Sequence, residues 1–160
     1  MPSGNFNFMM PADCSTRARD LFTYWQSVHP ESGLPGRQHI NPADIVPLLP
    51  DVWLLDVQRA PLRFRYRLIG TRLAEFYGVD HTGKWLDEVF PQFVGSETHS
   101  DCEAIVADGQ PRWRRGKPYL NYEEDFYQLE RIFLPLAANG TDVDMLFCLT
   151  VFFDTEGSAH

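Results

Sequence analysis

The segment Asp142–Phe153 near the end of the chain constrains the fold most, because as a strand it would be apolar on both faces. Successive side chains of a strand point to opposite sides of the sheet. One side would carry Val143, Met145, Phe147, Leu149, Val151 and Phe153, and the other would carry Leu146, Cys148 and Phe152. A strand that is apolar on both sides is covered on both sides. We expect the cover of one face to be an N-terminal helix or a second protomer.

Helices are predicted where apolar residues recur at steps of three and four. This spacing runs from Ser15 to Val28, with Ala18, Leu21, Phe22, Trp25 and Val28 on one face. Asn41 is typical of the cap of a second helix, which Pro47 and Pro50 keep short. Three further short helices are predicted at Arg72–Tyr77, Trp85–Phe90 and Ser96–Asp108.

Extended patterns predict four strands before the last one, over Val52–Val57, Phe64–Leu68, Arg112–Tyr119 and Phe126–Leu136. In the second of these, alternation places Phe64, Tyr66 and Leu68 on one face and arginines on the other. Asn139-Gly140 predicts a type I′ turn before the last strand. The order of elements predicts an α+β fold: a five-stranded antiparallel sheet, short helices between strands two and three, and an N-terminal flanking helix.

A single domain is expected, because a chain of 160 residues buries a sizeable core without metal or disulfides. We place it at residues 13–154, after a flexible lead at 1–12 and before a tail at 155–160. A net charge of −8 argues against nucleic acid as a partner. No apolar run approaches the length of about 20 residues that spans a membrane, and the start does not resemble a signal peptide. Three cysteines without C-x-x-C spacing predict reduced thiols and a cytoplasmic location.

Four segments in this order resemble the PAS domain family, in a subfamily of stand-alone bacterial PAS proteins. They are residues 41–50 (NPADIVPLLP), 64–71 (FRYRLIGT), 82–90 (TGKWLDEVF) and 130–136 (ERIFLPL), and the resemblance covers about residues 15–154. It implies a sensory or regulatory module whose sheet and central helices enclose a small pocket. It also implies a homodimer formed through the outer face of the sheet with help from the N-terminal helix, for which the interface residues would be Leu21, Phe22, Trp25 and Val28.

The predicted ligand-binding residues are Tyr66, Leu68, Phe76, Tyr77, Trp85, Phe90, His99, Cys102, Arg131 and Phe133. The aromatic members suit a small apolar or aromatic ligand, and they suit a packed core without a cavity equally well. The sequence predicts no particular cofactor and leaves an unidentified small organic ligand open. Haem held by His99 is disfavoured, because a single histidine without a motif is more often a hydrogen-bonded residue. The cysteine motif of flavin-photosensing PAS domains, G-x-N-C-R-F-L-Q, is absent, since Cys102 lies in the sequence HSDCEA.

Arg131 lies between Leu129 and Phe133 on one face of a predicted strand. A buried guanidinium requires a partner. We favour an internal ion pair with Glu103, Asp87 or Glu88, or a solvated face, over an anchor for a carboxylate or phosphate ligand. The basic segment Arg112–Lys117 contains one tryptophan, which is typical of single-stranded nucleic-acid binding, but the solvated side of a strand is the preferred interpretation.

No motif of a hydrolase, metalloprotease, nucleotide-binding or dinucleotide-binding site is present. The sequence therefore predicts a signalling module rather than an enzyme, in which pocket occupancy or partner docking shifts the packing of the N-terminal helix. A sensor kinase is the partner class that the resemblance implies. The alternatives are a small pocket enzyme of the isomerase or cyclase type and a ligand-free structural adaptor.

Overall fold

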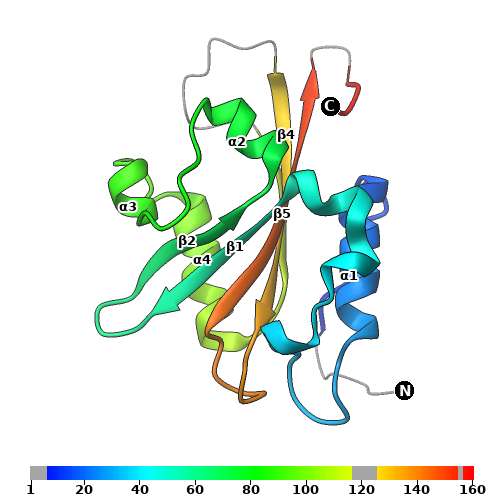
Figure 1. The fold of residues 1–160 in the computed structure, drawn as a ribbon, viewed down its shortest axis with the longest axis vertical. Helices are drawn as coiled ribbons and strands as arrows, with labels where there is room; N and C mark the ends of the chain where they lie inside the picture. The colour runs from blue at the N-terminus through cyan, green and yellow to red at the C-terminus, as the bar shows by residue number, and fades with distance from the viewer. Residues whose placement is uncertain (1–6, 117–125, 155–156) are drawn as a thin grey trace.

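The computed structural model describes residues 7–116, 126–154 and 157–160. Within them the strands form one antiparallel sheet in the order β2-β1-β5-β4-β3 (Figure 1). The strands are β1 (Val52–Gln58), β2 (Arg63–Ile69), β3 (Arg112–Gly116), β4 (Phe126–Leu136) and β5 (Met145–Asp154). The predicted five-stranded antiparallel α+β fold is confirmed, with β5 in the middle of the sheet.

Helices flank the sheet on both faces. They are α1 (Thr16–Ser27), η1 (Arg37–His39), η2 (Pro42–Asp51), α2 (Thr71–Tyr77), α3 (Leu86–Val89) and α4 (Glu97–Asp108). The helices α1 and η2 pack against one face, which we call the outer face. The helices α2, α3 and α4, which lie between β2 and β3 in the chain, pack against the opposite, inner face (Figure 1).

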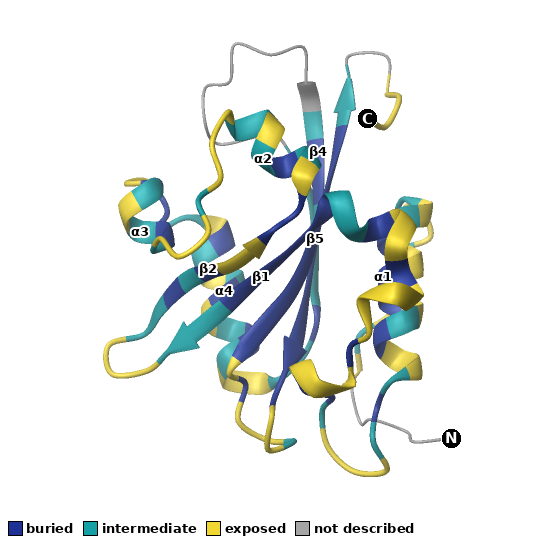
Figure 2. Cartoon of the chain, in the orientation of Figure 1, coloured by how far each residue is buried: buried dark blue, intermediate teal, exposed yellow. Residues whose placement is uncertain are grey.

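The side chains of β5 divide between these two faces. Met145, Phe147, Leu149 and Val151 pack with the outer helices, and Leu146, Cys148 and Phe152 pack with the inner helices. β5 is buried from Met145 to Phe152, as the dark ribbon in Figure 2 shows. The helix α1 of the same chain therefore covers the outer face, where the sequence had left a second protomer as the alternative. Val143, which precedes β5, packs on the inner side instead.

The predicted ends of the long helices are confirmed by their caps. The Ser15 hydroxyl accepts a hydrogen bond from the Ala18 N–H at 3.1 Å and begins α1. The Ser96 hydroxyl accepts one from the His99 N–H at 3.1 Å and begins α4. Gly109, with a φ of 67°, ends α4 in the left-handed conformation that glycine adopts without steric cost. Two amphipathic segments of the sequence thus become helices that begin at the positions of their polar caps.

The predicted orientation of Leu68 is wrong. The pairing of β1 with β2 shifts in register between Leu54 and Leu55, so Leu54 lies opposite Leu68 while Leu55 lies opposite Tyr66. The shift leaves Arg67 as an extra residue, and every side chain beyond it changes face. Leu68 is therefore 42% exposed and lies on the opposite side of the sheet from Tyr66.

The turn before β5 also differs from its prediction. A type I′ turn requires positive φ at both central residues, and Asn139 is not among the described residues with positive φ. The Asn139 side chain instead accepts hydrogen bonds from the N–H groups of Thr141 and Asp142, at 3.0 and 2.8 Å. The hairpin between β4 and β5 is confirmed, but a longer, side-chain-stabilised loop closes it.

Both ends of the described chain contact the domain. The ring of Phe8 lies 5.6 Å from that of Phe22 in α1, measured between centroids. At the other end, the His160 N–H donates to the Phe152 carbonyl at 2.8 Å, so residues 157–160 return along β5. Residues 1–6 of the predicted lead and 155–156 of the predicted tail lie outside the described residues, as do 117–119 of the predicted third strand.

Candidate functional site

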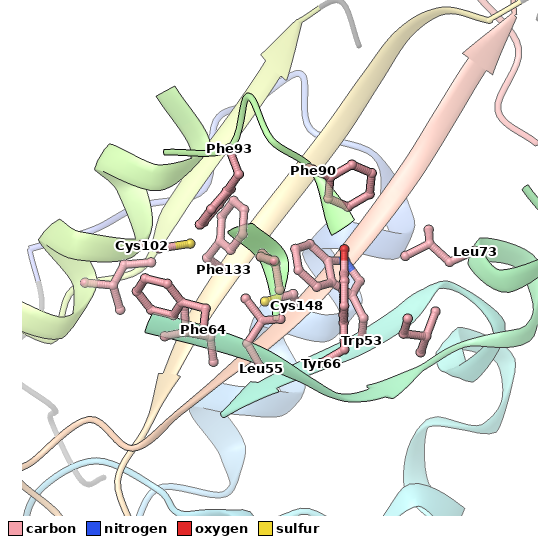
Figure 3. Packing of buried hydrophobic residues seen from close by; sticks show 14 of the residues in the cluster. Trp53, Leu55, Phe64, Tyr66, Leu73, Phe90, Phe93, Cys102, Phe133 and Cys148 are labelled. Carbon is pink, nitrogen blue, oxygen red and sulfur yellow. The ribbon is translucent and has the colours of Figure 1, made fainter. Parts of the chain in front are cut away.

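Aromatic rings from the sheet and the inner helices pack together on the inner face (Figure 3). The Trp53 ring lies 5.9 Å from Tyr66 and 5.6 Å from Phe133, between centroids. The rings of Tyr77 and Phe90 are 5.6 Å apart, and those of Phe76 and Phe152 are 4.1 Å apart. Pairs at these separations are in contact. Five of the predicted ligand-binding residues thus belong to this cluster, and each packs against another ring of the core: Tyr66, Phe76, Tyr77, Phe90 and Phe133.

The two inner cysteines belong to this packed core. Cys102 in α4 and Cys148 in β5 are fully buried free thiols. Burial, which disfavours the thiolate, raises the pKa of both thiols far above the ordinary value, and the neighbouring Arg131 opposes the shift only in part. A thiol that stays protonated is a poor nucleophile. Cys102 therefore contributes packing at the inner face.

A cavity of about 410 Å³ opens beside this core, where the start of α4 faces β3 and β4. Its lining combines two arginines with hydroxyl, backbone and apolar groups: Gly95, Ser96, Glu97, Thr98, Arg114, Gly116, Leu129, Arg131 and Phe133. Ligand cavities of proteins have volumes of about 300–1,000 Å³. Of the predicted ligand-binding residues, Arg131 and Phe133 border this cavity.

The two arginines of the cavity lie opposite each other on neighbouring strands. Arg114 of β3 pairs in register with Arg131 of β4. Arg131 donates to the Thr98 hydroxyl at 3.3 Å, and that threonine is buried in the first turn of α4. Arg114 makes a two-pronged ion pair with Asp101, at 2.9 and 3.0 Å, which raises the pKa of the guanidinium. A third contact of Arg114, with Glu97 at 3.2 Å, lies at the mouth of the cavity.

The acids considered as partners of Arg131 contact other residues. Arg63 binds Asp87 with two hydrogen bonds of 2.8 Å and holds the pKa of that carboxyl below its ordinary value. Arg63 also reaches Glu88 at 3.3 Å. Glu103 lies 3.2 Å from the His99 ring. These contacts tie β2 to α3 and stabilise the start of α4.

Two other predicted ligand-binding residues lie away from the cavity lining. Trp85 precedes α3, and its ring lies beneath the guanidinium groups of Arg63 and Arg65, at 4.2 and 5.4 Å from the centroid. His99 packs beside Phe93, with ring centroids 5.0 Å apart, and its Nδ1 accepts the Gly95 N–H at 3.1 Å. His99 therefore contributes to the structure that starts α4.

The residue before Arg131 faces the other side of the sheet and holds α1. Glu130 is fully buried, and its carboxylate accepts hydrogen bonds from the Ser15 N–H at 2.9 Å, from the Ser15 hydroxyl and from the Trp113 indole at 2.8 Å. Arg115 lies 3.5 Å from the same carboxylate. The cap of α1 is thus attached to β4 next to the arginine that borders the cavity.

A second buried carboxylate connects α1 with the inner helices. Asp51, at the end of η2, is 1% exposed. It binds Arg17 of α1 at 2.6 Å and Arg72 of α2 at 2.6 and 2.7 Å. One carboxylate therefore joins a helix of the outer face to a helix of the inner face.

The predicted dimer-interface residues of α1 are covered by the sheet of their own chain. Leu21 and Trp25 are 0% exposed, Phe22 is buried, and Val28 is half-buried against the same cluster. The Trp25 indole donates to the Pro135 carbonyl of β4 at 3.0 Å. The sheet of the same chain therefore already covers the side chains that were predicted as a dimer interface, and the homodimer itself stays a prediction.

A scan against protein-family models completes this picture. The model described as PAS domain matches residues 14–150, from the cap of α1 into β5. The chain belongs to the PAS domain family. A search of curated proteins found no match. PAS domains generally act as sensory or regulatory modules rather than as enzymes, and the resemblance found in the sequence is thereby confirmed at the level of the family and the fold.

The described part of this PAS domain contains neither a membrane-spanning helix nor a metal-binding group of side chains. None of its helices is both long and apolar enough to cross a bilayer. Nor do three or more His, Cys, Asp or Glu side chains gather there in a group that would hold a metal ion.

Several residues of the PAS inner face were not predicted as site residues. Thr98, Arg114 and Leu129 border the cavity, although Arg114 appeared only as part of a basic strand and Ser96 only as a helix cap. His81 is half-buried among aromatic rings, 5.4 Å from that of Tyr77. Burial is the main cause that lowers its pKa, with Lys84 as a smaller one. The sequence contained one clue to these cavity residues: alternation along β3 places Arg114 and Gly116 on the same face of the strand.

Proposed function

We propose that this PAS domain is a sensory module that binds a small organic ligand in the cavity beside Arg131 and signals through α1. The observation that carries the proposal is the position of two neighbours on β4. Arg131 borders the cavity on the inner face, and Glu130 holds the cap of α1 on the outer face. A ligand that moves β4 therefore acts on α1 directly.

Asp51 supplies a second connection in this proposal. Its carboxylate binds arginines of α1 and α2, so a displacement of α2 over the inner face changes the contacts of α1 as well. A ligand that binds one arrangement of these elements better than another shifts the population toward it. The signal is then a change in the packing or the exposure of α1.

The output surface in this proposal is the exposed side of α1. Asp20, Thr23 and Ser27 lie on that side, opposite the buried Leu21 and Trp25. A signalling protein such as a sensor kinase is the partner class that we propose. A homodimer formed through this side of α1 is tested by light scattering at several concentrations: a mass that rises toward twice 18.4 kDa supports it, and a constant 18.4 kDa contradicts it. We also propose a cytoplasmic location, which the three free thiols support.

The cavity has a position at which it can be blocked. Gly116 borders it, and a Cβ added at this residue meets no atom of residues 7–116, 126–154 or 157–160 within 4 Å. Gly116→Phe fills the space with a ring, and Gly116→Ala serves as the matched control that adds one methyl group. Native mass spectrometry of the purified full chain then compares the molecules that each variant retains.

We expect the wild-type chain and Gly116→Ala to retain the same small molecule and Gly116→Phe to lose it. A spectrum in which the wild-type chain carries nothing contradicts ligand binding and supports the ligand-free adaptor. Retention that is equal in Gly116→Phe contradicts the location in this cavity. Conversion of the retained molecule to a product by the chain supports the pocket enzyme instead.

A further inference from the structure

We infer that the cavity beside Arg131 binds a small organic monocarboxylate. The carboxylate would lie between Arg131 and Arg114, and a short apolar body would lie against Leu129 and Phe133. This inference rests on the proposed function, because it names the chemical class of the ligand for that same cavity. The lining carries it: guanidinium groups on two strands at one place, and a buried leucine and phenylalanine beside them.

The arrangement of the two arginines favours an anion between them. They are direct cross-strand partners, so a carboxylate bound between them would lie beside both guanidinium groups. Asp101 holds the Arg114 guanidinium from one side with two hydrogen bonds, which fixes its orientation before any ligand arrives. Thr98 fixes Arg131 in a similar way through its hydroxyl. Guanidinium groups that are already oriented bind a carboxylate at a smaller loss of side-chain entropy.

The chain itself places a carboxylate at the mouth of this cavity. Glu97 borders the cavity and contacts Arg114 at 3.2 Å, while its side chain is 79% exposed. An exposed ion pair of this kind contributes little to stability, so an incoming carboxylate displaces it easily. The contact of Glu97 shows that Arg114 can bind a carboxylate at this position. Glu97 would therefore compete with the ligand carboxylate for Arg114.

The neighbouring acids distinguish a monoanion from a dianion. Glu97 and Asp101 both lie beside Arg114, and their charges oppose the approach of a second negative charge on the ligand. The planar guanidinium also matches the two oxygens of a carboxylate. A monocarboxylate with an apolar body thus fits this lining better than a phosphate.

The test is a calorimetric titration of the full chain with phenylacetate, with its neutral analogue phenylacetamide and with inorganic phosphate, all at one ionic strength. We expect phenylacetate to bind at least tenfold more tightly than either of the others. Arg131→Gln should remove this preference, and Glu97→Gln should raise the affinity for phenylacetate severalfold by removing the competitor. Arg67→Gln, which changes an exposed arginine outside the cavity lining, is the matched control and should leave the affinity unchanged.

The outcomes separate this inference from the proposed function. Equal binding of phenylacetate and phenylacetamide overturns the carboxylate class, and so does equal binding of phosphate. Absence of phenylacetate binding overturns it as well. In each of these cases, a neutral molecule that the wild-type chain retains and Gly116→Phe loses still supports the sensory module. If Arg131→Gln does not fold, the Glu97→Gln variant provides the test. The inference is overturned if Glu97→Gln has the same affinity for phenylacetate as wild type, or a lower one.

Discussion

The two faces of the sheet are both apolar, yet they are closed in different ways. On the outer face, α1 is attached by buried polar contacts as well as by packing: the Ser15 groups on Glu130, and the Trp25 indole on the Pro135 carbonyl. On the inner face, α2, α3 and α4 pack through aromatic and other apolar side chains and leave a cavity beside the half-buried Arg131. The outer face thus fixes the position of α1, whereas the inner face leaves a cavity of about 410 Å³. In our proposal, the inner face receives the signal and α1 reports it.

The largest expected effect tests the outer face. Trp25→Ala removes a fully buried indole and its hydrogen bond to β4, so we expect the free energy of unfolding to fall by about 3–5 kcal/mol. Urea denaturation measures it. Thr23→Ala, which changes an exposed residue of the same helix, should stay within about 0.5 kcal/mol of wild type. A loss below about 1 kcal/mol for Trp25→Ala would mean that α1 is not docked on the sheet.

The next effect concerns the buried polar anchor. Glu130→Gln removes the charge that Ser15, Trp113 and Arg115 share, and it brings an amide N–H₂ to a site whose neighbours are donors. A buried donor without an acceptor costs about 1–3 kcal/mol, and we expect a loss of about 2–3 kcal/mol in the same denaturation experiment. Hydrogen exchange at the start of α1 should accelerate. Unchanged exchange there would contradict the role of Glu130 as the anchor of α1.

A matched pair of enlargements compares the two faces directly. Ala18→Leu adds methyl groups to a fully buried position between α1 and the sheet, and overpacking should cost about 1–2 kcal/mol. Gly116→Leu adds a larger group where the cavity is open, and it should cost less than Ala18→Leu. Thermal denaturation of both variants measures the difference. Equal losses would show that the inner face is as tightly filled as the outer one.

The smallest effect is a dependence of stability on pH. His29 is buried after α1, and burial lowers its pKa in the folded chain below the ordinary value of about 6.5. The unfolded chain therefore binds the proton more tightly, so the contribution of His29 to stability is present above pH 6.5 and is lost as the pH falls below it. We expect His29→Gln to lose less stability than wild type between pH 7.5 and 5.5. A larger loss of stability in His29→Gln than in wild type over this pH range would contradict the expected contribution of His29.

The sequence predicted the helices and strands of both faces better than it predicted the cavity on the inner face. Ser96 and Gly109 mark the ends of α4, and the alternation along β5 separates the two clusters, because these signals are local. Leu68 was assigned to the wrong face, since a register shift depends on the partner strand rather than on alternation within β2. The cavity likewise arises where the start of α4 meets β3 and β4, so Thr98 and Arg114 come together only in three dimensions.

In our proposal, β4 transmits the state of the cavity to α1. The most direct test is hydrogen exchange measured by mass spectrometry on Gly116→Phe, whose ring occupies the cavity in place of a ligand, with Gly116→Ala as the control. We expect hydrogen exchange in the first turn of α1, next to Ser15, to differ between the two variants. Hydrogen exchange in the β1–β2 hairpin should be the same in both. Identical exchange in α1, with changes confined to α4 and β4, would contradict it.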